Sequence, residues 1–383
     1  MPERMNPHFT IRNRFQKRSE LYSHILTQET LRDVCQRVTG CLDYTCDFVD
    51  AVNVGRLATI EYDGTITYVS FSETGDVGGR NSSFQSLPSA VVRYYRDTHA
   101  NKRICFYFLQ ASGNVETSYF RFMYRLMATA GVEFINADAV LTLRICPFST
   151  VEDIIAARDA NRLRNRSNNS TYVTISTNHV IQIYGKTYGA SKKETALLCI
   201  ALSRITPTQI ELYEICEGNL TVLPELDREV IQSLGRVTVI PTDLTMERQE
   251  FLYDNSLRSP RFTYNLLERL GPKKCALCGC EIPELVAGAH IWPVAAIKRE
   301  TRYSIEEMIE FATDGDNGVW LCENHHKMLD EDLLKIGLSG TIEFRPGLEV
   351  TSREYIANTT PTTQLASAIL TDHFVAYLRR RYQ

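Results

Sequence analysis

The chain has 383 residues, an apolar fraction of 44 % and a formal net charge of −4. This length is sufficient for two or three domains, each with a packed core. The mildly acidic balance does not exclude nucleic acid as a partner, because such binding depends on local basic patches. A membrane-spanning helix is excluded, because the sequence contains no apolar run of about eighteen residues.

The expected location follows from the first residues and the cysteines. The segment MPERMNPHFTIRNRF lacks the apolar core of a secretory signal, so we expect a cytoplasmic protein. The eleven cysteines are then expected to be thiols or metal ligands instead of disulfides. Seven of them are scattered among apolar residues and are predicted to lie in hydrophobic cores: Cys35, Cys41, Cys46, Cys105, Cys146, Cys199 and Cys216.

Residues 1–165 are predicted to form an α+β domain that recognises DNA. RLATIEYDGTITYVSF is typical of a hairpin, since Asp63-Gly64 is a strong two-residue turn. RICFYFLQ is typical of a buried strand, and SYFRFMYRLMATAG has apolar residues at helical spacing. The polar loop between hairpin and strand has two interpretations, base recognition or simple exposure. Its candidate base-reading residues are Arg80, Asn81 and Gln85.

Residues 166–255 alternate between predicted strands and helices, which favours a small α/β domain for DNA binding or dimerisation. Lys186 lies between two glycines in YGKTYGASKKET and is a candidate contact to a phosphate backbone. This stretch does not match the nucleotide-binding spacing that ends in Gly-Lys-Ser/Thr. LYDNSLRSPRFTYN is predicted to be a linker into a domain at 256–345.

Residues 346–383 are predicted to be a helical extension ending in Arg379, Arg380 and Arg381. These three arginines have two interpretations, a contact to nucleic acid or a solvated tail. The predicted fold class is therefore α+β, with mixed N-terminal and middle domains that precede a smaller, separately stabilised domain.

Two pairs of metal-ligand residues mark that smaller domain. Cys275 and Cys278 enclose two residues and precede a glycine, and Cys322 and His325 repeat the same gap. Four such ligands in two pairs are typical of a closed tetrahedral Zn²⁺ site, which staples a domain with little core of its own. Cys280 is an alternative to Cys278.

His326 follows directly after the fourth zinc ligand and cannot easily share its ion. On a helix that begins near Glu323, His326 points about 100° away from His325 and faces Asp330, four residues later. The adjacent histidines are therefore expected to divide their tasks, one stapling the fold and one facing a working site.

The segments CALC, AHIWP and DGDNGVWLCENHHKMLDED together resemble an HNH nuclease domain of the ββα-metal (His-Me finger) fold. The resemblance covers about residues 272–345. In that family a histidine ends a strand, an asparagine follows on the second strand or its loop, and a last histidine lies on the helix. The matching residues here are His290, Asn317 and His326.

The resemblance implies hydrolysis of a phosphodiester bond that leaves a 5′-phosphate and a 3′-hydroxyl. His290 would be the general base, because a neutral imidazole suits that task near pH 7. His326 would bind a catalytic divalent ion, Mg²⁺, with Asp330 as a second ligand. Asn317 would orient His290 through its backbone or help to hold the ion.

One position departs from the family. Many members carry an acidic or second histidine ligand just before the general base, where this chain has Ala289. Asp314 or Asp316 could complete the ligand set, although both also suit a turn before Asn317. Between His290 and Asn317, SIEEMIEFA is predicted to form a short amphipathic helix that begins with a capping box.

Three basic residues before that helix, Lys298, Arg299 and Arg302, are candidate contacts to DNA phosphates. The layout resembles bacterial restriction endonucleases, in which preceding domains select the DNA. We therefore expect an endonuclease of restriction type that defends against foreign double-stranded DNA and acts as a homodimer. Alternatives are a nuclease specific for methylated DNA, a ligand-activated anti-phage nuclease, and a zinc-containing DNA-binding regulator without catalysis.

Overall fold

The computed structural model describes residues 8–13, 28–41, 43–51, 55–71, 87–108, 118–135, 145–164, 171–186, 190–215, 225–242, 244–253 and 259–383. Contacts divide the chain into two compact units. Unit 1 comprises residues 1–161, 185–210 and 220–239, and unit 2 comprises residues 162–184, 211–219 and 240–383. Residues 166–255 contribute to both units, and the division into four domains stays a prediction.

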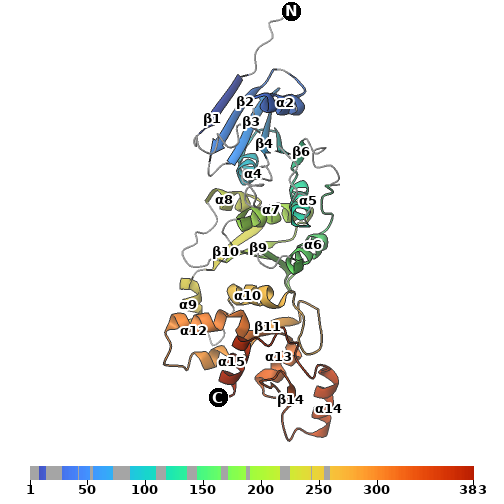
Figure 1. Ribbon diagram of the computed structural model, residues 1–383, viewed down its shortest axis with the longest axis vertical. Helices are drawn as coiled ribbons and strands as arrows, with labels where there is room; N and C mark the ends of the chain where they lie inside the picture. Colours follow the sequence, from blue (N-terminus) through green and yellow to red (C-terminus); the bar gives the residue numbers. More distant parts are fainter. Residues whose placement is uncertain are drawn as a thin grey trace, which may run out of the picture. The chain divides into compact units, whose positions relative to one another are not determined.

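A six-stranded mixed sheet dominates unit 1 (Figure 1). Its strands lie in chain order: β1 (His8–Asn13), β2 (Thr45–Ala51), β3 (Gly55–Tyr62), β4 (Thr65–Phe71), β5 (Asn101–Tyr107) and β6 (Glu133–Ile135). The pairs on either side of β3 are antiparallel, and the remaining pairs are parallel. The helices between these strands are α2 (Gln28–Thr39), α4 (Leu87–Arg96) and α5 (Ser118–Thr129).

The local predictions for this sheet are confirmed. Tyr62 pairs with Thr65 across the turn, where Asp63 and Gly64 both have positive φ, at 44° and 68°. A two-residue turn of this kind matches the right-handed twist of its strands. Helix α5 buries the predicted apolar stripe.

A four-stranded sheet has the order β10-β9-β8-β7. Its strands are β7 (Thr171–Ile175), β8 (Ile181–Lys186), β9 (Ile210–Ile215) and β10 (Val237–Thr242). The helices that flank these strands in the chain are α6 (Val151–Arg164), α7 (Ala190–Ile205) and α8 (Glu225–Ser233). The alternation predicted from the sequence is therefore confirmed.

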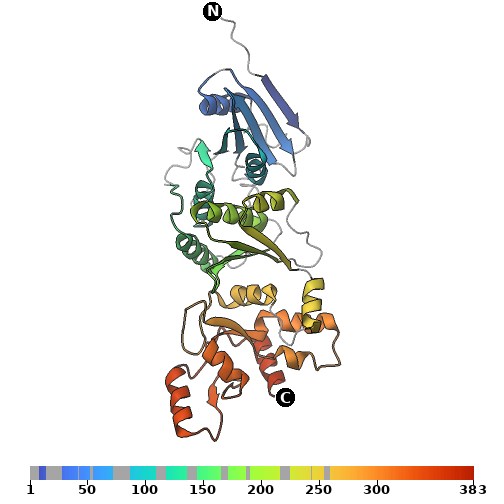
Figure 2. The same ribbon diagram turned by 180° about the vertical axis from the view of Figure 1, so that it is seen from behind.

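The rest of unit 2 is built around the hairpin of β11 (Val286–His290) and β12 (Gly318–Cys322). Figure 1 shows its helices in yellow to red, and Figure 2 shows them from behind. The other elements are α9 (Leu244–Tyr253), α10 (Pro260–Leu270), α11 (Val294–Ile297), α12 (Ile305–Thr313), η4 (Gly315–Asn317), α13 (Glu323–Asp330), β13 (Leu334–Ile336), β14 (Ile342–Phe344), α14 (Val350–Thr359) and α15 (Asp372–Arg381).

The predicted linker LYDNSLRSPRFTYN is wrong at both ends, because α9 extends to Tyr253 and α10 begins at Pro260. Ser259 caps this helix by accepting a hydrogen bond from the Arg261 N–H, and Pro260 occupies the first helical position. Both are favourable starts for a helix. The capping box predicted for α12 is confirmed, with reciprocal bonds between Ser304 and Glu307.

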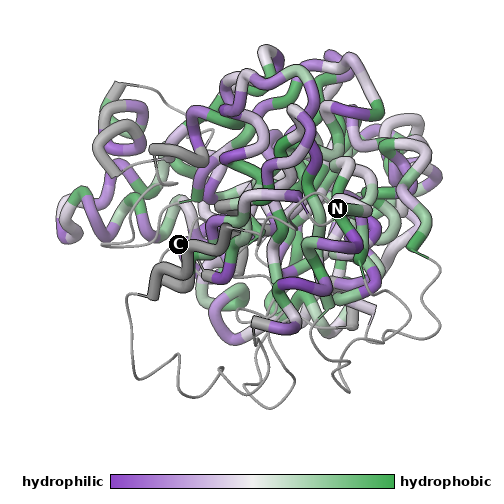
Figure 3. The backbone as a smooth tube through the Cα atoms, turned by 90° about the horizontal axis from the view of Figure 1, so that it is seen from above, coloured by the Kyte–Doolittle hydropathy of each residue, from purple (hydrophilic) through white to green (hydrophobic). Residues whose placement is uncertain are grey.

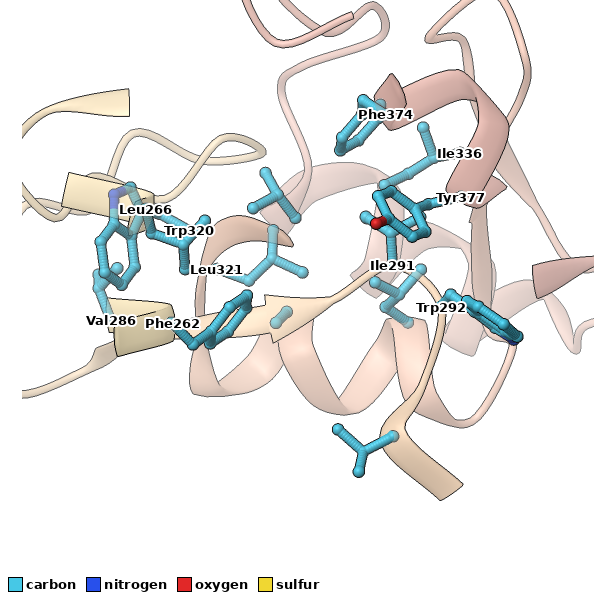
Figure 4. Packing of buried hydrophobic residues seen from close by; sticks show 14 of the residues in the cluster. Phe262, Leu266, Val286, Ile291, Trp292, Trp320, Leu321, Ile336, Phe374 and Tyr377 are labelled. Atoms are coloured by element: carbon cyan, nitrogen blue, oxygen red, sulfur yellow. The ribbon is translucent and has the colours of Figure 1, made fainter. Parts of the chain in front are cut away.

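One hydrophobic cluster joins the elements of unit 2 (Figure 4). Helix α10 packs very closely on the hairpin, since a Cβ atom on Gly288 would lie 2.5 Å from Leu266 and one on Gly318 would lie 2.6 Å from Phe262. Helix α15 contributes Phe374 and Tyr377 to the same cluster. Residues of α10 and α15 therefore complete the hydrophobic core around the hairpin of β11 and β12.

Two further sequence predictions concern apolar residues. Figure 3 shows hydrophobic and hydrophilic stretches interspersed along the chain, and within the described residues no helix has the length and apolarity needed to cross a membrane. Cys35, Cys46, Cys105 and Cys199 are buried as predicted. The prediction is wrong for Cys41 and Cys146, which are exposed. Cys216 lies outside the described residues.

Candidate active site and metal centre

Three thiols and one imidazole meet beside the hairpin. The ligand atoms of Cys275, Cys278, Cys322 and His325 all lie within 4.8 Å of one another. Cys322 is the N-cap of α13, so His325 lies in the first turn of that helix and faces back to its sulfur. The first pair sits on a turn in which the Gly279 N–H donates to the Cys275 carbonyl. Cys280 is not part of the cluster.

The His325 ring is oriented by both of its nitrogens. Nδ1 lies 3.0 Å from Cys322 Sγ and 3.5 Å from Cys275 Sγ, while Nε2 lies 3.1 Å from Oγ1 of the buried Thr360. A histidine that binds a metal through one ring nitrogen typically makes a hydrogen bond to a protein group through the other. Three sulfurs and one nitrogen at this spacing suit a tetrahedral Zn²⁺ ion.

The thiols of this cluster differ in acidity. Burial opposes ionisation of Cys275, but hydrogen bonds with His325 and with backbone N–H groups lower its pKa to about 6. Burial raises the pKa of Cys278 to about 12. Of the first pair, Cys275 is therefore the thiol that ionises more readily, and it is also the more buried of the two. A metal cation binds the thiolate form of a cysteine.

His290 is the last residue of β11 and pairs with Gly318 of β12. Its Nε2 lies 2.8 Å from the carbonyl oxygen of Ala312. A carbonyl oxygen only accepts hydrogen bonds, so Nε2 carries the proton and Nδ1 carries the free lone pair. The Phe262 ring stacks on the imidazole with centroids 3.9 Å apart and planes 9° apart.

Burial lowers the pKa of His290 from 6.5 to about 4, against a smaller opposing effect of the Ala312 carbonyl. The charge of nearby His326 acts in the same direction as burial. The ring is therefore neutral at pH 7, with one orientation and one available nitrogen. A neutral ring with an available lone pair is able to accept a proton from water, as a general base does.

Asn317 is fully buried, and its side chain is occupied by the backbone. Oδ1 accepts from the Trp292 N–H at 2.7 Å, and Nδ2 donates to the carbonyls of Trp292 and Phe311 at 3.1 and 2.9 Å. Its own carbonyl accepts from the Ile291 N–H. Asn317 thus ties the chain after His290 to the end of α12, next to the carbonyl that orients the His290 ring.

His326 and Asp330 lie on one face of α13. His326 Nε2 is 3.6 Å from Asp330 Oδ2, and the two side chains are 33 % and 53 % exposed. An imidazole and a carboxylate in this position can give a divalent ion two ligands and leave its other positions to water and substrate.

Asp314 and Asp316 have other partners. Asp314 caps η4 by accepting from the Asp316 N–H, and it also accepts from the Tyr377 hydroxyl. Asp316 accepts from Arg269 at 2.9 Å and from Thr371 at 2.6 Å. Both carboxylates therefore build the turn before Asn317 and join it to α10 and α15. With His373 they also form a group of possible metal ligands, whose ligand atoms all lie within 4.8 Å of one another, so metal binding at Asp314 or Asp316 stays a prediction.

The predicted DNA contacts have different surroundings. Arg80, Asn81 and Gln85 lie outside the described residues. Lys186 is only 8 % exposed in β8, and its contact to a phosphate backbone stays a prediction. Lys298 is partly buried with its Nζ 5.0 Å from the Phe251 ring centroid, and Arg299 is exposed.

Sequence reasoning missed three residues that contact the site: Phe262, Thr360 and Arg381. The Ser-Pro start of α10 was a usable signal for the helix that carries Phe262. No local pattern marks Thr360 or Arg381, because both contact the site only through the folded chain.

Comparison with known families matches residues 275–336 to the HNH endonuclease family. The matched segment contains both ligand pairs, the hairpin with His290, Asn317, and the helix with His326 and Asp330. No curated protein matches the chain.

Proposed function

Taking residues 275–336 as an HNH endonuclease domain, we propose that this protein is a metal-dependent DNA endonuclease of restriction type. The observation that carries the proposal is His290, a neutral imidazole with a fixed ring and a free Nδ1, close to the partly exposed His326, which lies beside Asp330. A binding module without catalysis has no need of this combination.

In the proposed reaction, Nδ1 of His290 removes a proton from a water molecule. The water oxygen forms a bond to phosphorus, and the bond between phosphorus and the 3′ oxygen breaks. The products are a 5′-phosphate and, after proton uptake from solvent, a 3′-hydroxyl. The Ala312 carbonyl and the Phe262 ring keep the imidazole in place, and Asn317 keeps both strand and helix ends in place.

His326 and Asp330 are the proposed ligands of the catalytic Mg²⁺ ion. When bound, such an ion neutralises charge on the phosphate and stabilises the leaving oxygen. Cys275, Cys278, Cys322 and His325 are the proposed ligands of a structural Zn²⁺ ion. This ion would join the turn with Cys275 and Cys278, before β11, to the start of α13, so that the helix cannot move away from the hairpin.

The restriction role rests on layout. An HNH domain makes few base-specific contacts, so the preceding residues would select double-stranded DNA, and a homodimer would cut both strands. Within unit 2, the exposed Arg299 remains a proposed phosphate contact, with Lys298 beside it.

The test is digestion of unmodified phage DNA by the purified protein, with Mg²⁺ or with EDTA. The His290→Ala variant should cut more slowly by a factor on the order of 10² to 10⁴, because it lacks the general base. The exposed His99→Ala, outside both groups of possible metal ligands in the described residues, is a matched control. Discrete fragments that need both Mg²⁺ and His290 support a sequence-specific restriction nuclease.

Other outcomes redirect the proposal. Full cutting by His290→Ala would refute the role of this residue. If unmodified DNA stays intact but methylated DNA is cut, the protein is a modification-dependent nuclease. If neither is cut although DNA is bound, the protein is better described as a DNA-binding regulator.

A further inference from the structure

The three arginines near the end of α15 have different surroundings, although the sequence presents them as one basic run. Arg379 is exposed. Arg380 lies against four aromatic rings, with its guanidinium carbon 4.8 Å from the Trp292 centroid and 4.9 Å from that of Phe311. Tyr303 and Tyr377 provide the other two rings, each at 5.7 Å.

Arg381 is partly buried and donates to backbone carbonyls from two different elements. Nη1 lies 3.1 Å from the Ile291 oxygen and 3.5 Å from the His290 oxygen, directly after β11. Nη2 lies 2.6 Å from the Leu329 oxygen, in the last turn of α13. One planar guanidinium therefore connects the strand that carries His290 to the helix that carries His326.

The chemistry of both attachment points favours a cation. The last carbonyls of a helix lack intrahelical partners and carry the negative end of its dipole, so a charged donor stabilises that end of α13. Charge-assisted hydrogen bonds are also stronger than neutral ones. The neighbouring residues hold Arg381 in place, since Arg380 packs on the aromatic rings and the Tyr382 hydroxyl accepts from the Ile336 N–H.

We propose that Arg381 is a positioning residue for the nuclease reaction, which sets the placement of His290 relative to His326 and Asp330. This inference rests on the proposed function. It places a determinant of the site on α15, beyond the matched residues 275–336. In this role Arg381 acts through the backbone carbonyls that it binds and not through a DNA phosphate.

The experiment compares Arg381→Ala, Arg381→Lys and Arg379→Ala in the full chain with Mg²⁺ and bound zinc. Arg379→Ala removes the same charge from the same helix, at an exposed side chain. We expect Arg381→Ala to lower the single-turnover cleavage rate on the order of 100-fold, because misplacement of reacting groups by about 1 Å has effects of this size. DNA affinity and zinc content should not change.

Two rescue measurements separate positioning from general damage. Lysine reaches one carbonyl but cannot bridge two, so Arg381→Lys should recover only part of the rate. Added guanidinium ion, at concentrations far below those that unfold the protein, should accelerate Arg381→Ala and should not accelerate His290→Ala. Weaker DNA binding with an unchanged rate would overturn the proposal and make Arg381 a phosphate contact. Equal rates in Arg381→Ala and Arg379→Ala would also overturn it.

A readout without activity keeps this test separate from that of the proposed function. Hydrogen exchange should become faster in Arg381→Ala at residues 286–292 and 323–331, and should be unchanged in Arg379→Ala. If the wild-type protein cuts no DNA, the proposed function fails, while exchange still decides whether Arg381 joins the two elements. Unchanged exchange at both segments would refute the connection itself.

Discussion

Three histidines of the segment that matches the HNH family have the same ionisable ring, and their neighbours give each a different environment. His325 is enclosed by thiols and Thr360, His290 by Phe262 and a carbonyl, and His326 is one-third exposed beside a carboxylate. Hydrogen-bond partners decide which ring nitrogen is free. The proposed roles of staple, base and ligand follow from those environments.

The lowered pKa of His290 predicts a pH-dependent contribution to stability. Its pKa is about 4 in the folded chain and 6.5 ordinarily, so the unfolded chain binds the proton more readily between these values. The contribution is complete above pH 6.5 and is lost as the pH falls through 4. Its upper limit is about 3 kcal/mol, from the size of the shift.

The measurement is chemical denaturation of the wild type and of His290→Gln, from pH 7.5 to pH 4, without Mg²⁺. The difference in unfolding free energy between the two proteins should shrink as the pH falls. Titration of the thiols is common to both proteins and cancels in the difference. A difference that is constant with pH would show that His290 is no less basic in the folded chain than in the unfolded one.

At the scale of elements, contacts with helices α10, α13 and α15 hold the hairpin of β11 and β12 in place. Helix α10 lies so close that Gly288 and Gly318 have no room for a side chain, and it brings Phe262 onto the His290 ring. The face of α13 opposite Asp330 packs into the core through Met328 and Leu329. Helix α15 contributes Arg381, which donates a hydrogen bond to the carbonyl of Ile291 at the end of the hairpin strand.

Substitution Gly318→Ala tests the packing of α10. The new Cβ would lie 2.6 and 2.8 Å from atoms of Phe262, so the ring or the whole helix must shift. Such overpacking costs about 1–3 kcal/mol of stability. The stack on His290 would also loosen, so the cleavage rate should fall. Ala287→Ser, at an exposed position of the same hairpin, is the control and should melt like the wild type.

If Gly318→Ala melts and cuts like the wild type, α10 adapts without loss, and Phe262 is not needed to hold the base. Loss of stability with a normal cleavage rate would separate the two effects, since α10 would then support the fold but not the His290 ring.

At the scale of the whole molecule, the matched HNH segment is a small part of a chain whose larger part forms two further sheets. Its own cluster relies on Thr360, Phe374 and Leu378, which follow the matched residues, and on Phe262, which precedes them. The proposed nuclease domain thus includes residues on both sides of the matched segment.

Replacing Cys275 by serine tests the proposed structural Zn²⁺ site. The variant should lose bound zinc and melt at a lower temperature, because metal binding in such sites is coupled to folding. Cys280→Ser is the matched control, since this thiol belongs to the same turn but not to the cluster. Metal analysis and melting curves of both variants are the measurements. Equal zinc loss in the two would mean that Cys280 is a ligand.

The sequence alone was sufficient for what depends on short-range spacing. The paired ligand gaps, the order of His290, Asn317 and His326, and the strand and helix periods are all local, and the family match covers the same segment. Folding was needed for contacts between residues far apart in the chain. The burial of Lys186 depends on which elements pack around β8. The hydrogen bonds of Asn317 and Arg381 depend on which backbone carbonyls tertiary packing brings within reach of their side chains. No local pattern in the sequence encodes these contacts.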